Sequence, residues 1–274
     1  MNGGSGSGSG TYSYARNSTW QRNGAAAMED ALKEAAMESL DLQKVLCDSN
    51  TFVVADLGCS VGHHHRSPWE EQAGSFYGSL FPSSSIHIAY SSSALNWLSK
   101  VPEGSIIHYN GAPDAVASAY EAQFEEDMEV FFRCRAREIA AGGLMLFSMA
   151  AVPSRDVQHP VALMYTFIES ILIDMVKEVD SFNLPIVLPS IEEIRRLAEK
   201  NKCFEIVKME NAMEGETKIA VMHLRAGLEG TLTNHFGNEI VEQVFERAMQ
   251  QHHNLQSTQI HTSSAGIFVV LRRH

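Results

Sequence analysis

The sequence predicts an α/β fold in which helices cover both faces of one sheet. Short apolar runs of the kind that form buried strands alternate with longer segments of helical periodicity. One apolar run ends in an acidic residue and a Gly-x-x-x-Gly turn, which indicates a buried parallel strand running into a tight loop. The 274 residues, 45% of them hydrophobic, suffice for one large domain or for a domain with a sizeable insertion.

Helices are predicted where strong helix formers or apolar residues recur at helical spacing. They span residues 25–46, 115–143, 161–177, 190–201 and 221–252, the last range holding two helices. The glycine pair Gly142–Gly143 suits a C-terminal cap for the long second helix. Ser190 and Glu193 have the spacing of a capping box, which predicts a helix start.

Strands are predicted within residues 51–62, where the strand runs into the tight loop, and at residues 85–90, 144–150, 203–210 and 266–273. A parallel neighbour for the first strand requires a crossover of at least about 10–12 residues, normally a helix. Residues 63–84 are rich in helix breakers and have no helical period. We therefore expect the chain to be discontinuous between Gly62 and His63, with joining residues absent.

Composition excludes several classes of partner. Asp and Glu outnumber Lys and Arg by 33 to 21, and the net charge of -12 repels nucleic acid and anionic membranes. A local pocket can still bind a small anion. The four cysteines are scattered without a CxxC pair, which indicates reduced thiols in an intracellular protein. No uncharged run reaches the ~18 residues of a membrane span, and the N-terminus has no apolar signal core. The Gly/Ser run of residues 1–10 fits either a flexible spacer or a native mobile lip.

The segment ADLGCSVG, residues 55–62, indicates a nucleotide-type binding turn at the carboxyl end of a strand. It is not a dinucleotide GxGxxG motif, and it lacks the lysine of a phosphate-binding P-loop. An acidic residue before the turn suits a cationic ligand, so Asp56 is a candidate for the amino end of S-adenosylmethionine. A tight structural turn is the alternative.

Six motifs in order carry a family resemblance: SYARNSTWQR, VADLGCSVG, GSFYGSLFP, SSSALNWLSKVP, VDSFNLP and LTNHFGNEIVEQVFE. Together they resemble the plant SABATH methyltransferases, which transfer a methyl group from S-adenosylmethionine to small carboxylic acids or to xanthine ring nitrogens. The resemblance runs from the N-terminus to the last predicted strand. It implies a Rossmann-like class I methyltransferase sheet with an α-helical cap over the active site.

The resemblance also implies the residues of the site. At the cofactor it places Tyr14, Ser18, Asp56, Gly58, Cys59, Ser75 and Phe76. Around the substrate it places Gln21, Ser93, Asn96, Trp97, Met164, Tyr165 and Val187. Some relatives hold a magnesium ion at positions that match Asp180, Phe182 and Asn183, and a loop cap is the alternative for Asp180.

The implied mechanism needs no general base, because the sulfonium methyl is activated and a carboxylate with a pKa of about 4 is already ionised. Gln21 and the Trp97 indole would hold one carboxylate oxygen and orient the other. From the residues alone, a core position is the commoner fate of a tryptophan such as Trp97. One alternative is an N-methyltransferase of xanthines, which the polar Ser93 and Asn96 leave open. The other is a non-catalytic ligand-binding member of the family, against which the retained Asp56, Ser75, Phe76 and Trp97 argue.

The sequence departs from the family pattern at several places. The acidic strand end that binds the ribose hydroxyls in relatives has no counterpart here, and loops look shortened after Pro102, Glu178 and Ala212. We expect one methyltransferase unit over 1–274. Its parts are the α/β core (about 25–150 and 200–274), the helical cap (about 155–200 and 212–235) and an N-terminal arm, 1–24. The resemblance implies a cytoplasmic homodimer.

Overall fold

The computed structural model describes residues 30, 33–40, 45–46, 51–58, 74–102, 108–109, 111–154, 159–176, 182–212, 217–256 and 266–274. Five strands form one mixed sheet in the order β1-β2-β3-β5-β4. They are β1 (Val54–Asp56), β2 (Ile86–Ser92), β3 (Ile139–Met149), β4 (Phe204–Ala212) and β5 (Gly266–Arg273). The first three strands are parallel, and β5 runs antiparallel to both of its neighbours.

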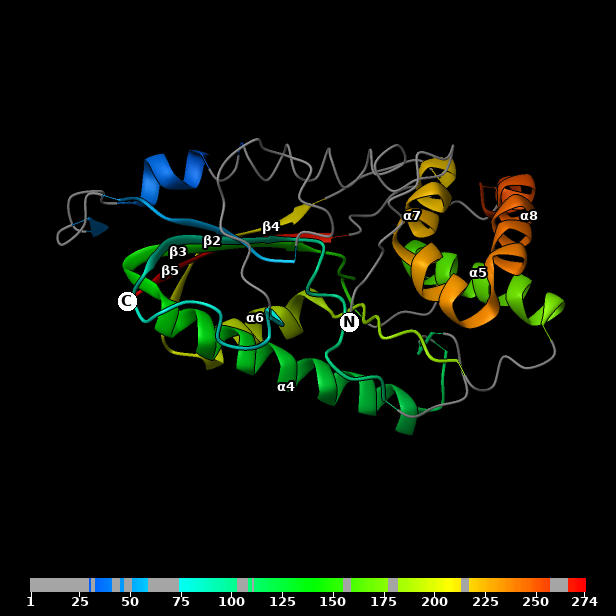
Figure 1. The fold of residues 1–274 in the computed structure, drawn as a ribbon, viewed down its shortest axis with the longest axis horizontal. Helices are drawn as coiled ribbons and strands as arrows, with labels where there is room; N and C mark the ends of the chain where they lie inside the picture. Colours follow the sequence, from blue (N-terminus) through cyan, green and yellow to red (C-terminus); the bar gives the residue numbers. More distant parts are fainter. Residues whose placement is uncertain are drawn as a thin grey trace.

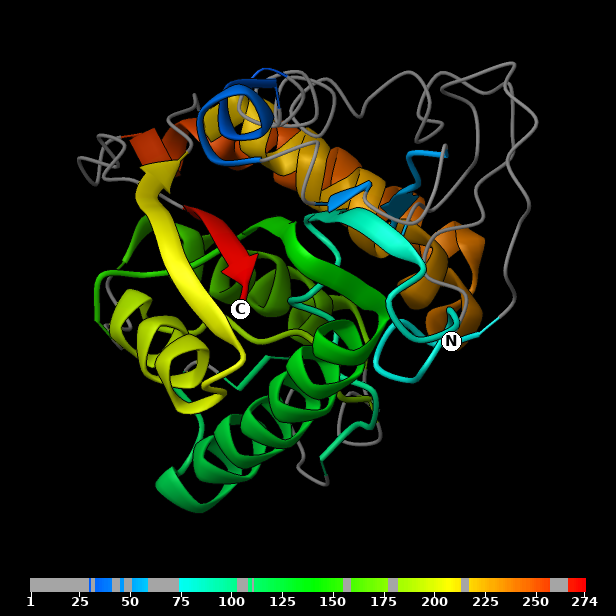
Figure 2. The same cartoon turned by 90° about the vertical axis from the view of Figure 1, so that its left-hand side faces the viewer.

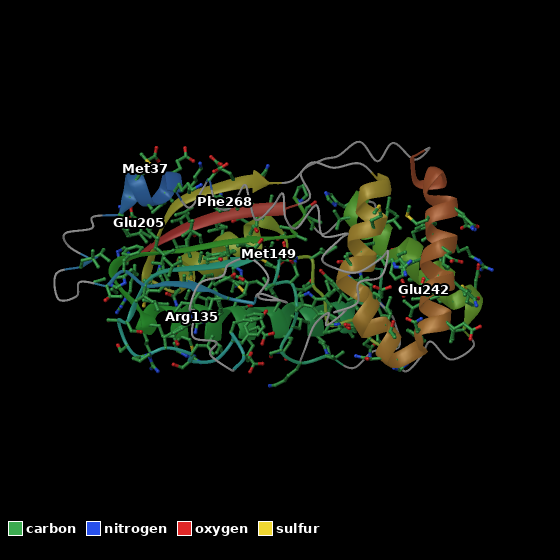
Figure 3. All side chains as sticks on the ribbon, turned by 45° about the horizontal axis from the view of Figure 1, so that its top comes forward. Met37, Arg135, Met149, Glu205, Glu242 and Phe268 are labelled. Carbon is green, nitrogen blue, oxygen red and sulfur yellow. The ribbon has the colours of Figure 1, made fainter. Side chains whose placement is uncertain are left out.

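Helices cover both faces of this sheet, as the sequence predicts (Figure 1). Side chains on β3 alternate between the faces, as the strand period of two requires. Phe147 belongs to the cluster that holds α4 (Asp114–Glu138) and α6 (Ile191–Lys200), whereas Leu146 packs with helical residues 33–39. Figure 3 shows Met37 and Arg135 on opposite sides of the sheet. Burial on both faces explains why the strands read as nearly continuous apolar runs.

A second hydrophobic cluster lies beyond the end of the sheet (Figures 1 and 2). It is built mainly from α5 (Pro160–Met175), α7 (Thr217–Phe236) and α8 (Asn238–Gln256). Gly237, at a φ of 85°, separates α7 from α8, a conformation that glycine adopts without strain. The predicted division into core and cap differs here. Helix α6, predicted in the cap, packs on the sheet, and α8, predicted in the core, packs in the helical cluster. Among the described residues, no helix is long and apolar enough to cross a membrane.

The predicted capping box is confirmed. The Ser190 hydroxyl oxygen accepts from the Glu193 backbone N–H at 3.1 Å, and the Glu193 carboxylate accepts from the Ser190 N–H at 3.2 Å. The second prediction about a helix end is wrong. The helix α4 ends at Glu138, before the glycine pair, and its C-cap residue Ile139 is already extended.

The pair Gly142–Gly143 lies inside β3, where it allows a bulge. Pairing steps from Ile86–Ile139 to Ile88–Leu144, so β3 advances by five residues while β2 advances by two. Gly142 has a φ of 81°, and a Cβ at Gly143 would lie 2.6 Å from the backbone oxygen of His87. The glycines are therefore required by the close approach of two strands.

Among the described residues, the first predicted strand is shorter than expected. Within 25–46 the described residues 30, 33–39 and 45 are helical, and of the described residues 51–58 only Val54–Asp56 form a strand. The first strand is parallel to its neighbour, as predicted, and that neighbour is β2. The expected discontinuity between Gly62 and His63 lies outside the described residues and stays a prediction.

Candidate active site

The turn after β1 lies against the end of β2. Asp56 is the last residue of β1 and pairs with Tyr90, and its side chain is exposed. Gly58 follows with a φ of 84°, and a Cβ there would lie 2.4 Å from the Ala94 Cβ. A side chain at position 58 is therefore excluded both by conformation and by space. The two carboxyl strand ends meet with their backbones in close contact, where sheets of this kind bind ligands.

The segment 74–82 runs from this turn back to the start of β2. Phe76 is half-buried, and its ring lies 3.5 Å from the position of a Cβ on Gly58, while Ser75 is exposed. The Ser75 carbonyl accepts from the Gly78 N–H at 2.8 Å, which closes a tight turn around Phe76. Asp56, Gly58, Ser75 and Phe76, four of the predicted cofactor residues, thus lie around one edge of the sheet.

A buried ion pair on α4 anchors this segment. Arg135 and Glu138 are 0% and 1% exposed, with 2.7 Å between Nη2 and Oε2. Arg135 donates to the carbonyls of Phe76 at 2.9 Å and Gly78 at 2.8 Å. Glu138 accepts from the Leu80 N–H at 2.7 Å. Burial lowers the pKa of the Arg135 guanidinium, and the carboxylate of Glu138 opposes that shift.

The turn after β2 holds the next predicted residues. Ser93 has a φ of 58°, an uncommon conformation for a residue other than glycine, and such strain is typical of functional sites. Asn96 is buried, and its amide bonds three backbone groups. Its Nδ2 donates to the carbonyls of Ala150 and Val187, both at 2.8 Å, and its Oδ1 accepts from the Ala150 N–H. Asn96 thus ties the ends of two strands to the segment that carries Val187. Its predicted place in the pocket wall stays a prediction.

Trp97 lies between the sheet and the helical cluster. Its backbone pairs with Ile186, and its half-buried side chain packs against the cluster that contains Met164 and Phe182. Among the described residues, the indole N–H has no hydrogen-bond acceptor. Trp97 is therefore neither a fully buried core residue nor a free surface residue.

Met164 and Tyr165 come together with Trp97 because α5 carries both into the same cluster. The Tyr165 ring stacks on His108, with 4.3 Å between centroids and 13° between planes. Burial lowers the pKa of His108 to about 3, so the imidazole is neutral. Val187 is buried in the sheet cluster instead, directly after Ile186, the bridge partner of Trp97.

Several predicted residues lie outside the described part of the chain: Tyr14, Ser18, Gln21, Cys59 and Asp180. Of the other two positions proposed for magnesium, Phe182 is buried among the rings of His235 and Phe236, and Asn183 is half-buried. Within the described ranges no group of three or more His, Cys, Asp or Glu residues is placed to hold a metal ion.

The sequence reasoning missed Tyr77, Arg135 and Glu138. Tyr77 donates from its hydroxyl to the Trp97 carbonyl at 2.7 Å, and the ion pair holds the segment around it. One signal was present for the pair. Arg135 and Glu138 are spaced i,i+3 on a helix whose neighbouring turns carry Met128, Phe131 and Phe132, so they share its buried face.

Comparison with known proteins gives a consistent result. A family model described as SAM dependent carboxyl methyltransferase matches residues 1–65 and 70–274. Loganic acid O-methyltransferase from Catharanthus roseus is 30% identical over 343 positions, covering 96% of this chain and 92% of the relative. Salicylate carboxymethyltransferase from Clarkia breweri is 34% identical over 204 positions, covering 64% and 57% of the two chains.

A solved structure titled as loganic acid methyltransferase with SAH superposes with a TM-score of 0.85. It is 28% identical and covers 97% of both chains. The alignment to the Catharanthus relative spans 343 positions although this chain has 274 residues, so the relative carries segments without a counterpart here. That agrees with the loops that look shortened in the sequence.

Proposed function

Because this chain belongs to the family of SAM dependent carboxyl methyltransferases, we propose that it forms the methyl ester of a small carboxylic acid. The observation that carries the proposal is the position of Trp97. Trp97 follows the turn after β2, whose Ala94 lies against Gly58, and among the described residues its half-buried indole N–H has no acceptor. A neutral donor beside the cofactor edge suits an anionic acceptor. The relatives named above are described as methyltransferases of loganic acid and of salicylate.

The residues at the sheet edge fit S-adenosylmethionine. Asp56 is an exposed carboxylate at a strand end and would bind the cationic amino group. Gly58 is exposed at the same strand end, and the ring of Phe76 would lie on the adenine with Ser75 beside it. Tyr14, Ser18 and Cys59 are proposed from the family resemblance to complete the site. When bound, this cofactor supplies a methyl group activated by its positive sulfur.

The chain contributes orientation and exclusion of water. A carboxylate with a pKa near 4 is ionised at neutral pH, so no side chain needs to remove a proton. Trp97 and Gln21 would donate to one carboxylate oxygen, leaving the second oxygen to attack. Both donors are neutral, so they orient the nucleophile without quenching its charge. Proximity of this kind can supply about 7–11 kcal/mol of a reaction barrier.

The pocket wall sets which acid fits. Met164 and Tyr165 present an apolar surface and one phenol, and Ser93 and Asn96 lie at the turn that carries Trp97. Val187 follows the residue paired with Trp97. We propose that these five residues select the acid, and that the enzyme works as a cytoplasmic homodimer. Size-exclusion chromatography with light scattering tests the dimer. The mass of a monomer would contradict this part of the proposal.

Methyl transfer to a panel of acceptors tests the proposed function. Loganic, salicylic and jasmonic acids and a monomethylxanthine are incubated with the full chain and labelled S-adenosylmethionine. We expect turnover of at least one acid and none of the xanthine. Trp97→Phe keeps ring packing but loses the donor, which costs ~1.5–3 kcal/mol, or about tenfold to a hundredfold in kcat/KM. Gln21→Ala should combine with it less than additively, because both hold one carboxylate. Turnover of the xanthine alone would reverse the proposal, and so would S-adenosylhomocysteine binding without any turnover.

A further inference from the structure

The hydroxyl of Tyr77 connects the two sides of the candidate active site. It donates to the Trp97 carbonyl at 2.7 Å and lies 3.3 Å from the carbonyl oxygen of Leu95. Tyr77 is buried, and it directly follows Ser75 and Phe76 in the chain. The ring of Phe76 lies 4.6 Å from that of Tyr77, centroid to centroid. One short segment therefore carries both the cofactor-side residues and the side chain that holds the turn of Trp97.

A side chain of α4 fixes the backbone on each side of Tyr77. The guanidinium of Arg135 donates to the carbonyl before Tyr77, that of Phe76, and to the carbonyl after it, that of Gly78. Both groups of the Arg135–Glu138 pair are almost completely buried, so solvent does not compete for these bonds. The backbone of Tyr77 is thus held in place by buried hydrogen bonds, and its side chain reaches from there to Trp97.

The Tyr77 hydroxyl meets the turn that carries Trp97, on the side of the site proposed for the acceptor. The backbone of Trp97 is also bonded to the carbonyl of Ala94 at 3.1 Å through its own N–H, and the next residue donates to Pro185 at 2.8 Å. These bonds fix the N–H groups of the turn. The Tyr77 hydroxyl supplies the bond to the carbonyl of Trp97, whose indole is proposed above to bind the acceptor.

We propose that Tyr77 is a positioning residue that sets the Trp97 indole relative to the cofactor-side Phe76, an inference that rests on the proposed function. The hydroxyl acts as a donor throughout the pH range of an assay. Burial, and next the charge of Asp127, raise the pKa of Tyr77 well above its usual range, so the proton stays on the oxygen.

The effect of Tyr77→Phe follows from this geometry. The ring stays and packs as before, while the Trp97 carbonyl loses its donor and the turn can relax. A misplacement of about 1 Å in a positioning group can cost about a hundredfold in rate, and we expect about a tenfold fall in kcat for the best acid. The KM for the acid and the affinity for S-adenosylhomocysteine should stay within about threefold, because Arg135 still holds Phe76.

A double-mutant cycle with Trp97→Phe separates positioning from a general structural role. If Tyr77 acts through the indole, its loss should matter little once the indole N–H is gone. We then expect Tyr77→Phe/Trp97→Phe to be within about threefold of Trp97→Phe alone. Tyr109→Phe is the control, because its buried hydroxyl also bonds the backbone: it donates to the Leu188 carbonyl at 2.9 Å and accepts from the Leu188 N–H at 3.0 Å. It should lower the melting temperature at least as much as Tyr77→Phe and combine additively with Trp97→Phe.

The outcomes distinguish the two proposals. A wild-type enzyme that methylates no acid overturns the proposed function, and this inference with it. An active wild type whose Tyr77→Phe variant keeps full kcat overturns the positioning role only, as do rate losses that multiply in the double variant. Equal non-additivity in the Tyr109→Phe cycle would show a general effect of lost stability and would also overturn it. Non-additivity confined to Tyr77 supports the inference.

Discussion

Replacing Glu138 by glutamine removes the countercharge of a completely buried arginine. Glutamine keeps the shape of the side chain and one oxygen that can accept from the Leu80 N–H. Its amide N–H₂, however, would face the Arg135 guanidinium across the present 2.7 Å, donor against donor. Breaking a buried ion pair by removing one partner costs about 3–5 kcal/mol. For a chain of this size that corresponds to a fall of about 6–20 °C in melting temperature.

Urea unfolding followed by circular dichroism measures this change in free energy. The matched control is Glu205→Gln, which removes the partner of Arg272 in an exposed pair with the same separation of 2.7 Å. Exposed pairs contribute little, so the control should melt close to wild type. Since Arg135 also fixes the carbonyl of Phe76, Glu138→Gln should bind S-adenosylhomocysteine more weakly than the control. A free energy of unfolding within about 1 kcal/mol of wild type would refute the claim that this pair anchors the segment.

Three further predictions concern the sheet edge and the cap. Asp56→Asn should abolish S-adenosylhomocysteine binding by calorimetry without changing the melting temperature, because its side chain is exposed; unchanged affinity would remove Asp56 from the site. Gly58→Ala should destabilise more than Gly111→Ala. Both have a φ of 84°, but only the first Cβ meets an obstacle, at 2.4 Å, and equal melting temperatures would contradict the close contact. His108 has its pKa lowered from 6.5 to about 3, so below pH 6.5 the unfolded chain takes up a proton that the folded protein refuses. Between pH 6.5 and 4.5 the free energy of unfolding of wild type should therefore fall by about 2 kcal/mol more than that of His108→Phe. Parallel plots of unfolding free energy against pH would contradict this.

The periodic parts of the fold could be predicted from the sequence. Buried strands and amphipathic helices follow from apolar spacing, and the capping box at Ser190 follows from two residues three apart. The glycine pair Gly142–Gly143 was wrongly predicted to end a helix, because helix C-caps and β-bulges both favour glycine. Only the neighbouring β2 backbone, 2.6 Å from a Cβ at Gly143, decides between the two.

The candidate site was predictable to the extent that its motifs are local. Asp56 and Gly58 lie next to each other in the sequence, and their turn could be recognised. The contact between Tyr77 and Trp97 joins residues twenty positions apart, and the bonds from Arg135 to the segment of Phe76 span 59 positions. Such contacts depend on how α4 packs under the sheet, which no local pattern shows. No local pattern shows the role of Asn96 either, because its side chain bonds the backbone of Ala150 and Val187, which are distant in the sequence.

The chemical nature of the product tests the central claim most directly. The full chain is incubated with its best acid and S-adenosylmethionine carrying a labelled methyl group, and the product is analysed by mass spectrometry before and after mild alkali. An ester methyl is released by alkali, whereas a methyl group on a ring nitrogen resists it. The account predicts one methyl group per acid, released by alkali, at a rate that falls about tenfold to a hundredfold in Trp97→Phe. An alkali-stable product, or an ester formed at the same rate by Trp97→Phe, would contradict it.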